Sequence, residues 1–430
     1  MKAALATIGC KVNSYETEAV AEILKQHGYE IVDFKAQADV YVINTCTVTN
    51  TSDQKSRQTI RKAVDQAPEA IVCVMGCYSQ LQADQVASIP GVHIVLGTKD
   101  RHRIPDFIEN YRSDSKPIIQ VEPLRKTEAF EVLTIEAFAR HQRAFLKIED
   151  GCDQFCSYCI VPFARGRIRS KAPEQVLKEA AELTENGFRE IVLTGIHTGG
   201  YGRDLANYRF VDLLRDLVKM PRLDRLRISS IEITELTAEV IAVLASSPRF
   251  AFHLHVPLQS GSARILQAMN RPYSKAEYLA KIKEIRQALP GIAITTDVIA
   301  GFPGETDADF EEMMDFIETI GFSELHVFPF SKRDGTVAAK MPGQVDGTTK
   351  KMRVARLLEQ SERLAKKYIR ENIGVRLEAI AETGDSGFLT GHTGNYVRVR
   401  FPGDREAIGQ LIPVQITAEA YPLSPAITIQ

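Results

Sequence analysis

Short apolar runs alternate with amphipathic stretches along the first quarter of the chain. The apolar runs have the length of buried strands, and the segments between them carry apolar residues at helical spacing. Strands are expected at residues 3–7, 31–34, 40–44, 71–75 and 93–96, with helices between them that include 15–27 and 53–66. This alternation is typical of an open, mostly parallel α/β sheet, which we expect over residues 1–112.

A break in this rhythm separates the first part of the chain from the second. Residues 113–142 contain Pro117, Pro123 and mixed charges, which indicate a connection or a small hairpin. Strands are then expected near 144–149, 190–194, 225–231, 252–257, 293–299 and 324–330, and helices at about 173–186, 208–219, 235–247, 275–288 and 306–319. Six successive βα units over residues 143–345 predict a barrel or partial barrel.

The last part of the chain begins with a basic amphipathic helix, expected over residues 350–370 within the segment 346–372. Its apolar stripe consists of Val354, Leu357, Leu358, Leu364, Ala365 and Tyr368, and lysines and arginines occupy the other side. Residues 373–430 contain short β-type segments between glycine-rich turns, which predict a small all-β domain. The expected fold class is therefore α/β, with an open sheet, a partial (βα)6 barrel and a small all-β domain.

Composition narrows the class of protein. The chain has 430 residues and a formal net charge of -2, so a surface for nucleic acid has to be local. It contains no run of eighteen apolar residues and no secretory signal, which favours a cytoplasmic protein without a membrane partner. Seven cysteines, an odd number, argue against a disulfide framework and for metal or redox chemistry.

Three cysteines stand close together after the first strand of the expected barrel. Cys152, Cys156 and Cys159 have the spacing C-x3-C-x2-C, on a segment where the active-site loops of such barrels lie. Soft thiolate ligands suit iron–sulfur clusters, and three of them leave one iron of a 4Fe–4S cluster open to a substrate or cofactor. A zinc knuckle is the alternative, but it usually needs a fourth Cys or His, and none is near.

A second set of cysteines lies in the first part of the chain. Cys10, Cys46 and Cys77 each come directly after an expected strand, where open α/β sheets place their ligands. We therefore expect these three residues to converge and to bind a second metal centre. Cys73 differs because it lies inside an apolar run, which favours a buried residue with a packing role.

The C-x3-C-x2-C motif resembles that of the radical S-adenosylmethionine (SAM) superfamily. The resemblance implies that the open iron binds SAM and that the cluster releases a 5′-deoxyadenosyl radical from it. Tyr158 stands at the position whose backbone contacts the SAM adenine, and Thr194 and Gly195 stand at the methionine-binding turn, although this sequence departs there from the usual GGE. Ser229, Ser230 and Glu232 follow the third barrel strand and suit the SAM ribose, or form a plain polar strand end.

The two cysteine sets together resemble the methylthiotransferases, and the resemblance covers essentially the whole chain. Residues 253–262, 269–273, 296–306 and 331–336 are similar to characteristic stretches of that family, which places Gln259 at the SAM pocket. The family has an N-terminal cluster domain, a radical SAM core and a C-terminal TRAM-type β domain that binds RNA. Residues 9–17 and 44–50 resemble the MtaB-type branch, which adds a methylthio group to carbon 2 of N6-threonylcarbamoyladenosine at tRNA position 37.

The resemblance also implies a separate chemical role for each of the two cysteine sets. Carbon 2 of adenine carries a strong, non-acidic C–H bond, so a carbon radical has to remove its hydrogen. The family uses two SAM molecules per turnover, with Cys152, Cys156 and Cys159 holding the cluster that makes the radical. Cys10, Cys46 and Cys77 hold a second 4Fe–4S cluster that presents the sulfur. An electron donor such as flavodoxin or ferredoxin and a sulfur source are the partners implied besides tRNA.

Local basic stripes are the expected contacts for the tRNA backbone. The helix 350–370 offers Lys351, Arg356, Arg363 and Lys367, and Lys55, Arg57, Arg61 and Lys62 form a second patch. A solvated helix face explains either stripe equally well. The all-β domain has arginines but no lysine, and its acidic residues are in excess, which departs from a simple RNA-binding surface.

Alternatives for the substrate and the function stay open on the sequence. Isopentenyladenosine in tRNA or a ribosomal protein are substrates within the same family, and a noncatalytic iron–sulfur or zinc RNA-binding protein is a different class. A threonylcarbamoyl group carries a carboxylate, so its pocket should offer a cation. Lys11, Arg165, Arg167 and Arg169 are available for it, and a solvent-facing or SAM-loop role suits them as well.

Overall fold

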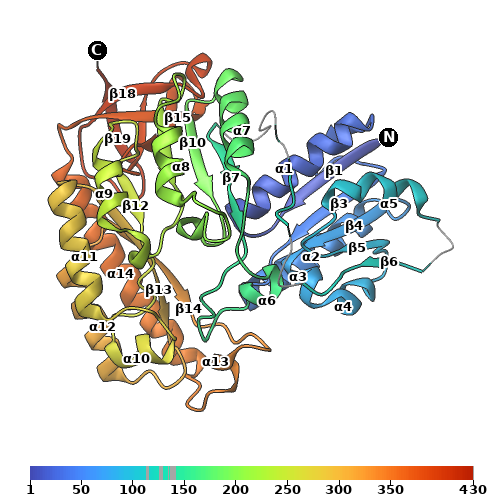
Figure 1. Cartoon of the computed structure of the whole chain (residues 1–430), viewed down its shortest axis with the longest axis horizontal. Helices are drawn as coiled ribbons and strands as arrows, with labels where there is room; N and C mark the ends of the chain where they lie inside the picture. The colour runs from blue at the N-terminus through green and yellow to red at the C-terminus, as the bar shows by residue number, and fades with distance from the viewer. Residues whose placement is uncertain (113–115, 125–128, 134, 136–141, 430) are drawn as a thin grey trace.

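A computed structural model describes residues 1–112, 116–124, 129–133, 135 and 142–429. Three assemblies of secondary structure follow one another along the chain: a parallel sheet, a partial barrel and a small closed barrel (Figure 1). Much of the stretch expected as a connection or hairpin, namely residues 113–115, 125–128, 134 and 136–141, lies outside the described residues.

The first assembly is a fully parallel sheet of six strands in the order β2-β1-β3-β4-β5-β6. The strands are β1 (Lys2–Thr7), β2 (Glu30–Val32), β3 (Val40–Thr45), β4 (Ile71–Gly76), β5 (Ile94–Leu96) and β6 (Ile118–Gln120). Five of them match the expected strands. β6 was not expected, because its apolar run is only Ile118 and Ile119 and falls in the stretch interpreted as a connection.

Helices cover both faces of this sheet. They are α1 (Lys11–Gln26), α2 (Asn50–Gln66), α3 (Cys77–Leu81), α4 (Ala83–Ala87) and α5 (Ile104–Asn110). Successive strand residues point to opposite faces, so Val40 and Val42 pack with α1 and α5, whereas Tyr41 and Ile43 pack with α2 and α4. Because the inner strands β3, β4 and β5 are buried on both faces, they read as continuous apolar runs.

The second assembly contains six parallel strands, arranged as β11-β10-β7 and β12-β13-β14 and joined by a parallel bridge between Leu226 and Phe250. The strands are β7 (Ala144–Lys147), β10 (Glu190–Thr194), β11 (Arg225–Ile228), β12 (His253–His255), β13 (Ala293–Ala300) and β14 (Glu324–Pro329). The outer helices are α7 (Pro173–Glu185), α8 (Phe210–Leu217), α9 (Ala238–Ala245), α11 (Lys275–Ala288) and α12 (Asp307–Ile320). This confirms the expected partial (βα)6 barrel.

Short elements decorate the mouth of the partial barrel. They are the antiparallel pair β8 (Glu149–Asp150) and β9 (Arg169–Ser170), the helices α6 (Val161–Arg165), α10 (Ala263–Ala268) and α13 (Val337–Lys340), and the 3-10 turns η2 (Thr198–Gly200) and η3 (Ile233–Glu235). A further short turn, η1 (Arg101–Arg103), precedes α5 in the first assembly. None was expected from the sequence, because each is too short to show a periodicity.

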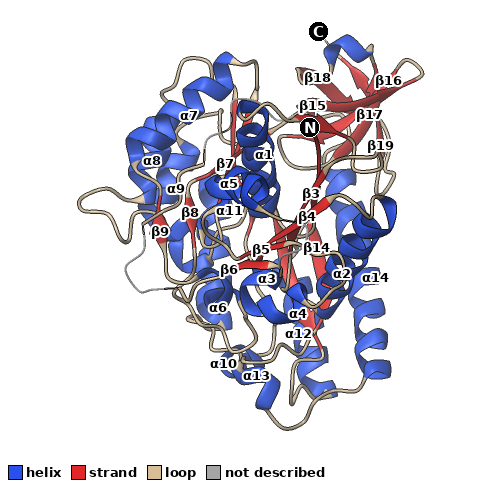
Figure 2. Cartoon of the chain, turned by 90° about the vertical axis from the view of Figure 1, so that its right-hand side faces the viewer, coloured by secondary structure: helices blue, strands red, loops and turns tan. Residues whose placement is uncertain are grey.

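The helix α14 (Gly347–Glu371) leads to the third assembly and runs along the side of the core below it (Figure 2). Asp346 caps α14 by accepting hydrogen bonds from the backbone N–H groups of Thr348 and Thr349. The chain then forms a closed barrel in the order β15-β16-β17-β19-β18, which confirms the expected all-β domain. Its elements are β15 (Arg376–Asp385), β16 (Phe388–Thr393), β17 (Arg398–Pro402), η4 (Arg405–Ala407), β18 (Leu411–Ile416) and β19 (Ser424–Thr428).

Among the described residues, no helix combines the length and the apolar composition that crossing a membrane would require.

Candidate active site

Three cysteines gather at one edge of the N-terminal sheet. Cys10, Cys46 and Cys77 follow β1, β3 and β4, which are neighbours in the sheet and run in the same direction. Because the carboxyl ends of parallel strands meet at one edge, the three thiols face a common point. Both other thiols contribute to the electrostatic environment of Cys77. The structure thus brings together the three residues that strand ends predicted.

Two glycines allow these loops to approach one another. Gly9 and Gly76, each directly before one of the cysteines, have φ angles of +121° and +107°. A Cβ on Gly9 would lie 2.8 Å from the Cβ of Cys46, and one on Gly76 would lie 2.5 Å from the carbonyl oxygen of Thr45. Glycine adopts this backbone region without strain and leaves room for the neighbouring loop.

Arg165 reaches the same edge from the core. Its Nε lies 3.2 Å from Sγ of Cys77, and its Nη2 donates to Oδ1 of Asn13 at 2.7 Å. Its Nη1 donates to Glu16 at 2.5 Å and to Asp150 at 3.2 Å. Burial raises the pKa of the Cys77 thiol to about 12, and the neighbouring guanidinium acts in the opposite direction. A cation beside the sulfur favours the thiolate, which is the form that binds metal.

Cys73 lies apart from this edge. It is part of β4, has no exposed surface, and packs with Val42 and Ile94 in the core of the sheet. Burial raises the pKa of its thiol. Its position is that of the buried packing residue that the sequence predicted.

The other three cysteines occupy the loop between β8 and α6. The N–H of Cys159 donates to the carbonyl of Cys156 at 3.0 Å, and the N–H of Cys152 donates to the carbonyl of Gly166 at 3.0 Å, which folds the loop back on itself. Cys156 and Cys159 both contribute to the electrostatic environment of Cys152. Nη1 of Arg271 lies 3.1 Å from Sγ of Cys156. This set of thiols is therefore also compact and also has a guanidinium beside it.

A cavity of about 220 Å³ opens beside this cysteine loop. Tyr158, Cys159 and Gln259 line it, together with apolar side chains that include Ile299 and Phe328. Gln259 has a φ of +66°, an unusual value for a residue other than glycine. Its backbone N–H donates to the carbonyl of Asp297 in β13 at 2.8 Å. Two residues that were predicted to border SAM thus share one cavity.

A larger cavity of about 550 Å³ lies where the three assemblies meet. Its lining comprises Gly9, Cys10, Lys11, Val12 and Val48 from the N-terminal sheet, Val161, Thr194, Gly195, Ile196, Arg227, Ser229, Ser230, His253, His255, Thr295, Asp297 and His326 from the core, and Tyr396 from the C-terminal barrel. Cys10 and the predicted SAM residues Thr194, Gly195, Ser229 and Ser230 therefore face one space. Glu232 pairs with Arg271, beside the cysteine loop.

Two family models match the chain: Uncharacterized protein family UPF0004 over residues 2–97, and the Radical SAM superfamily over residues 146–317. A relative from Bacillus subtilis (strain 168), threonylcarbamoyladenosine tRNA methylthiotransferase MtaB, is 48% identical over 422 residues, which cover 97% of this chain and 94% of the relative. The chain belongs to the radical SAM methylthiotransferase family. Membership in the radical SAM superfamily implies a 4Fe–4S cluster and SAM.

Other methylthiotransferases resemble the chain over a similar length. A tRNA-2-methylthio-N(6)-dimethylallyladenosine synthase from Pelotomaculum thermopropionicum (strain DSM 13744 / JCM 10971 / SI) is 34% identical, over 95% of this chain and 93% of that protein. Among solved structures, the radical SAM methyltransferase TsrM from Kitasatospora setae has a TM-score of 0.58 at 15% identity, covering 79% of this chain and 77% of that one. At that identity, the likeness to the solved structure shows the fold alone.

Cations border the larger cavity of this methylthiotransferase, and the sequence singled out Lys11 among them but not the arginines. Arg227 lines it, and its Nε lies 2.6 Å from Glu190, whose other oxygen is 3.2 Å from Arg225. Burial lowers the pKa of Lys11, and nearby guanidinium groups reinforce the effect. The signal for the arginines was two charged residues inside a short strand, Arg225-Leu226-Arg227-Ile228, which is unusual unless they are paired or functional.

Three further residues of this cavity were also missed as a group. His255, Asp297 and His326 lie on the adjacent strands β12, β13 and β14, and their ligand atoms all lie within 4.8 Å of one another, so they could hold a divalent cation. The imidazoles of His255 and His326 lie 3.2 Å and 3.4 Å from Oδ1 of Asp297. Burial alone would raise the pKa of Asp297, but hydrogen bonds from both histidines hold it well below its usual range.

Of the four cations weighed for a substrate carboxylate, Lys11 alone lines this cavity. Arg165 is bound by the carboxylates and the thiol described above, and Nη1 of Arg169 donates to the carbonyl of Arg165 at 2.8 Å. Arg167 is exposed and lies 3.2 Å from Asp153. The contacts of these three arginines are with the cysteine loop, with one another and with the N-terminal sheet, and not with the larger cavity.

The residues predicted to contact RNA divide into two kinds. Lys351 and Lys367 are exposed on α14, whereas Arg356 and Arg363 pair with Glu311 and Glu318 of α12. On α2, Lys55, Arg61 and Lys62 are exposed, and Arg57 donates to the hydroxyl of Tyr78 at 3.1 Å.

Proposed function

We propose that this methylthiotransferase adds a methylthio group to carbon 2 of N6-threonylcarbamoyladenosine at position 37 of tRNA. The observation that carries the proposal is the cavity of about 550 Å³, which Cys10 enters from one side and Thr194, Gly195, Ser229 and Ser230 enter from the other. A base held there can meet a sulfur from the N-terminal cysteines and a SAM molecule from the core. The MtaB name of the relative that is 48% identical supports the choice of modified base.

We infer that Cys152, Cys156 and Cys159 hold one 4Fe–4S cluster and that Cys10, Cys46 and Cys77 hold a second. The donor sets fit, because all six thiols are free and each set has a guanidinium within 3.2 Å of one sulfur. Such positive charge compensates the anionic thiolates. When bound, the core cluster and SAM supply a carbon radical that can remove hydrogen from a non-acidic C–H bond.

The side chains around the two cavities would position SAM relative to the core cluster. Tyr158 and Gln259 border the smaller cavity and would bind the adenine side of SAM. Thr194, Gly195, Ser229 and Ser230 would contact its methionine and ribose from the larger cavity. Glu232 would act through Arg271, which it orients toward Cys156.

The remaining parts have supporting roles in this proposal. Residues 1–112 form the cluster domain, 113–142 the connection, 143–345 the radical SAM core, 346–372 the basic helix, and 373–430 the TRAM-like domain. Lys351 and Lys367 would contact the tRNA backbone with Arg356 and Arg363 beside them. A reductant such as flavodoxin or ferredoxin and a sulfur source would act as partners, and the site of action would be the cytoplasm, where tRNA is modified.

Substrate choice is tested with two tRNAs that differ in one base. The reconstituted enzyme is incubated with SAM, a reductant and tRNA bearing either threonylcarbamoyladenosine or isopentenyladenosine, and the digested nucleosides are compared by mass. Addition of a methylthio group to the threonylcarbamoyl base, and little to the isopentenyl base, is expected. A preference for the isopentenyl base would overturn the proposed substrate, and product from neither would overturn the function.

A further inference from the structure

We propose that Lys11, Arg227 and Tyr396, contributed by three separate assemblies, form an anion pocket that binds the carboxylate on the N6 substituent of the substrate adenosine. This inference rests on the proposed function and adds the residues that determine its specificity. All three side chains line the cavity of about 550 Å³. They would make the enzyme selective for a substituent that carries a negative charge.

Lys11 is a cation without a counterion. It is the first residue of α1, and among the residues that the structure describes none forms an ion pair or hydrogen bond with its ammonium group. The side chain is partly buried beside the cavity. Because α1 begins there, the positive end of the helix dipole faces the same space. A partly desolvated cation at such a position attracts an anionic ligand.

Arg227 adds a second cation, and it shares its carboxylate partner with another arginine. Its Nε is bound to Glu190, and Arg225 shares that carboxylate while also lying 3.6 Å from the exposed Glu378. Its terminal nitrogens donate to the carbonyls of Thr393 and Gly394 at 3.3 Å, which leaves N–H groups available toward the cavity. Glu190 is the buried carboxylate beside Arg227, and two guanidinium groups share it.

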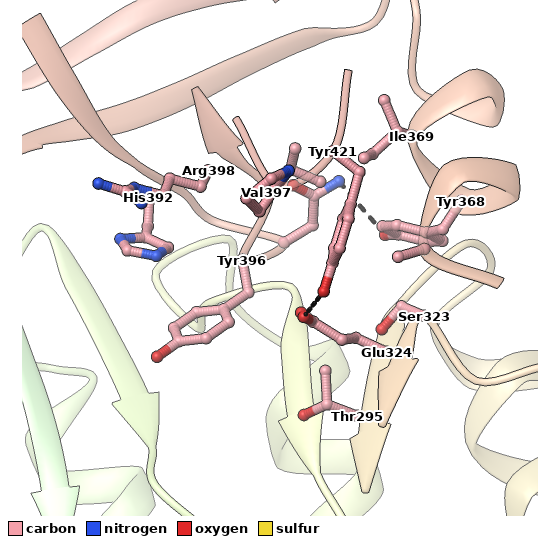
Figure 3. Close-up of a pocket in the computed structure, with 13 residues that line it drawn as sticks. Thr295, Ser323, Glu324, Tyr368, Ile369, His392, Tyr396, Val397, Arg398 and Tyr421 are labelled. Atoms are coloured by element: carbon pink, nitrogen blue, oxygen red, sulfur yellow. Dashed lines mark hydrogen bonds between the residues drawn. The ribbon is translucent and has the colours of Figure 1, made fainter. Parts of the chain in front are cut away.

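Tyr396 completes the pocket from the C-terminal barrel. It lies in the turn between β16 and β17 with a φ of +71°, which a tyrosine rarely adopts and which the surrounding contacts have to hold. Its ring stacks on His253, with centroids 4.5 Å apart, and lies 4.9 Å from the guanidinium of Arg227. In Figure 3 the ring points away from Tyr421 and toward the strands of the core. Tyr396 also lines the larger cavity, and the guanidinium of Arg143 lies 5.8 Å from the centre of its ring.

These three groups match the chemistry of one kind of substituent. A threonylcarbamoyl group ends in a carboxylate, which accepts hydrogen bonds from an ammonium, a guanidinium and a phenol. A dimethylallyl group offers none of these acceptors, and its entry would leave the cations buried without a partner. The acid that lines this cavity, Asp297, is already engaged by two histidines and does not neutralise the pocket.

The test compares two anticodon stem-loops that differ only in the charge of the substituent. One carries threonylcarbamoyladenosine, and the other carries the matching carboxamide, made from threoninamide. Dissociation constants are measured with the reconstituted holoenzyme in the presence of SAM. Wild-type enzyme is expected to bind the carboxylate about tenfold more tightly, which is the size of a charge-assisted hydrogen bond. Lys11→Met should abolish that ratio, Lys11→Arg should keep most of it, and Tyr396→Phe should reduce it.

Controls separate the pocket from the overall function. Lys283→Met removes an exposed lysine of α11 on the outside of the core and should leave the ratio at about tenfold. Iron content establishes that each variant is folded and loaded. A ratio that survives Lys11→Met would overturn the anion pocket while methylthio addition to the threonylcarbamoyl stem-loop still stands. Failure of the wild type to modify that stem-loop would instead overturn the proposed function.

Discussion

Glu190 shows how strongly the charges around the large cavity depend on one residue. It is fully buried on β10 and lies against Arg225 and Arg227. Burial alone would raise the pKa of its carboxyl, but Arg227, Arg225 and Arg143 together lower it to about 2. A drop from the usual 4.5 corresponds to about 3 kcal/mol of stability at neutral pH.

The low pKa of this carboxyl makes the stability of the fold depend on pH. Because the pKa is lower in the folded than in the unfolded chain, the stabilisation is complete above about pH 4.5 and is lost as the pH falls toward 2. Glu190→Gln should lower the free energy of unfolding by about 3 kcal/mol at pH 7 and by about half as much at pH 3, measured by urea denaturation. Glu69→Gln, at an exposed position, is the matched control. An equal loss at both pH values would contradict the ionised state of Glu190.

Single residues were predictable where their chemistry has a spacing or a strand end attached to it. The C-x3-C-x2-C spacing predicts the first set of ligands, Cys152, Cys156 and Cys159. Positions directly after strands predict the second set, Cys10, Cys46 and Cys77. Arg271 has no spacing or strand end of this kind, and Arg227 has only the weaker signal of a charged residue inside a short strand, because each acts through a partner far away in the sequence. The groups beside the sulfur and around the cavity therefore became visible only in three dimensions.

At the scale of the element, α14 illustrates what periodicity can and cannot tell. Its length and amphipathic character were predicted, and Leu357 and Leu364 are buried as expected. Leu358, placed in the apolar stripe, is 51% exposed, and Arg353, placed on the basic side, is buried against Glu305. The buried face is rotated because Arg353 can reach an acid of the core, a pairing that helical spacing alone does not reveal.

The basic face of α14 leads to a prediction about tRNA. Arg356 and Arg363 already pair with acids of α12, whereas no described residue forms an ion pair with Lys351 or Lys367. Replacing both lysines by Gln should weaken tRNA binding and reduce the slope of log affinity against log salt by about 2, since each phosphate contact releases a counterion. Replacing both arginines by Gln is the matched comparison and should change the slope far less. The opposite ranking would show that the arginines exchange Glu311 and Glu318 for phosphate.

Short elements were the other limit at this scale. β6 and the helices α3, α6 and α10 contain too few residues to show a repeat, and they form because longer elements provide a surface for them. α1 begins at Lys11, four residues before the helix expected at 15–27, because Cys10 in extended conformation directly precedes it. That shift places Lys11 at the cavity.

At the scale of the whole molecule, a buried ion network joins the N-terminal sheet to the core. Glu16 of α1 pairs with Lys147 at 2.7 Å and with Arg165 at 2.5 Å, and both cations also contact Asp150. Burying an incomplete set of charges is costly, so the network favours one relative placement of the two assemblies. The order of the three assemblies could be predicted from the sequence, but their mutual placement, and hence the shared cavity, could not.

The central claim is that one molecule carries two cysteine sets with different tasks. Iron content, SAM cleavage and methylthio product are measured together on reconstituted wild-type enzyme and two triple variants. Wild type should hold about eight irons, and each triple Cys→Ala variant about four. Cys73→Ala is the control, and it should keep about eight.

The decisive variant replaces Cys10, Cys46 and Cys77 by Ala. It should still cleave SAM to 5′-deoxyadenosine but form no methylthio product, whereas replacement of Cys152, Cys156 and Cys159 should abolish cleavage as well. Methylthio product from the N-terminal triple variant, or SAM cleavage by the core triple variant, would contradict the account.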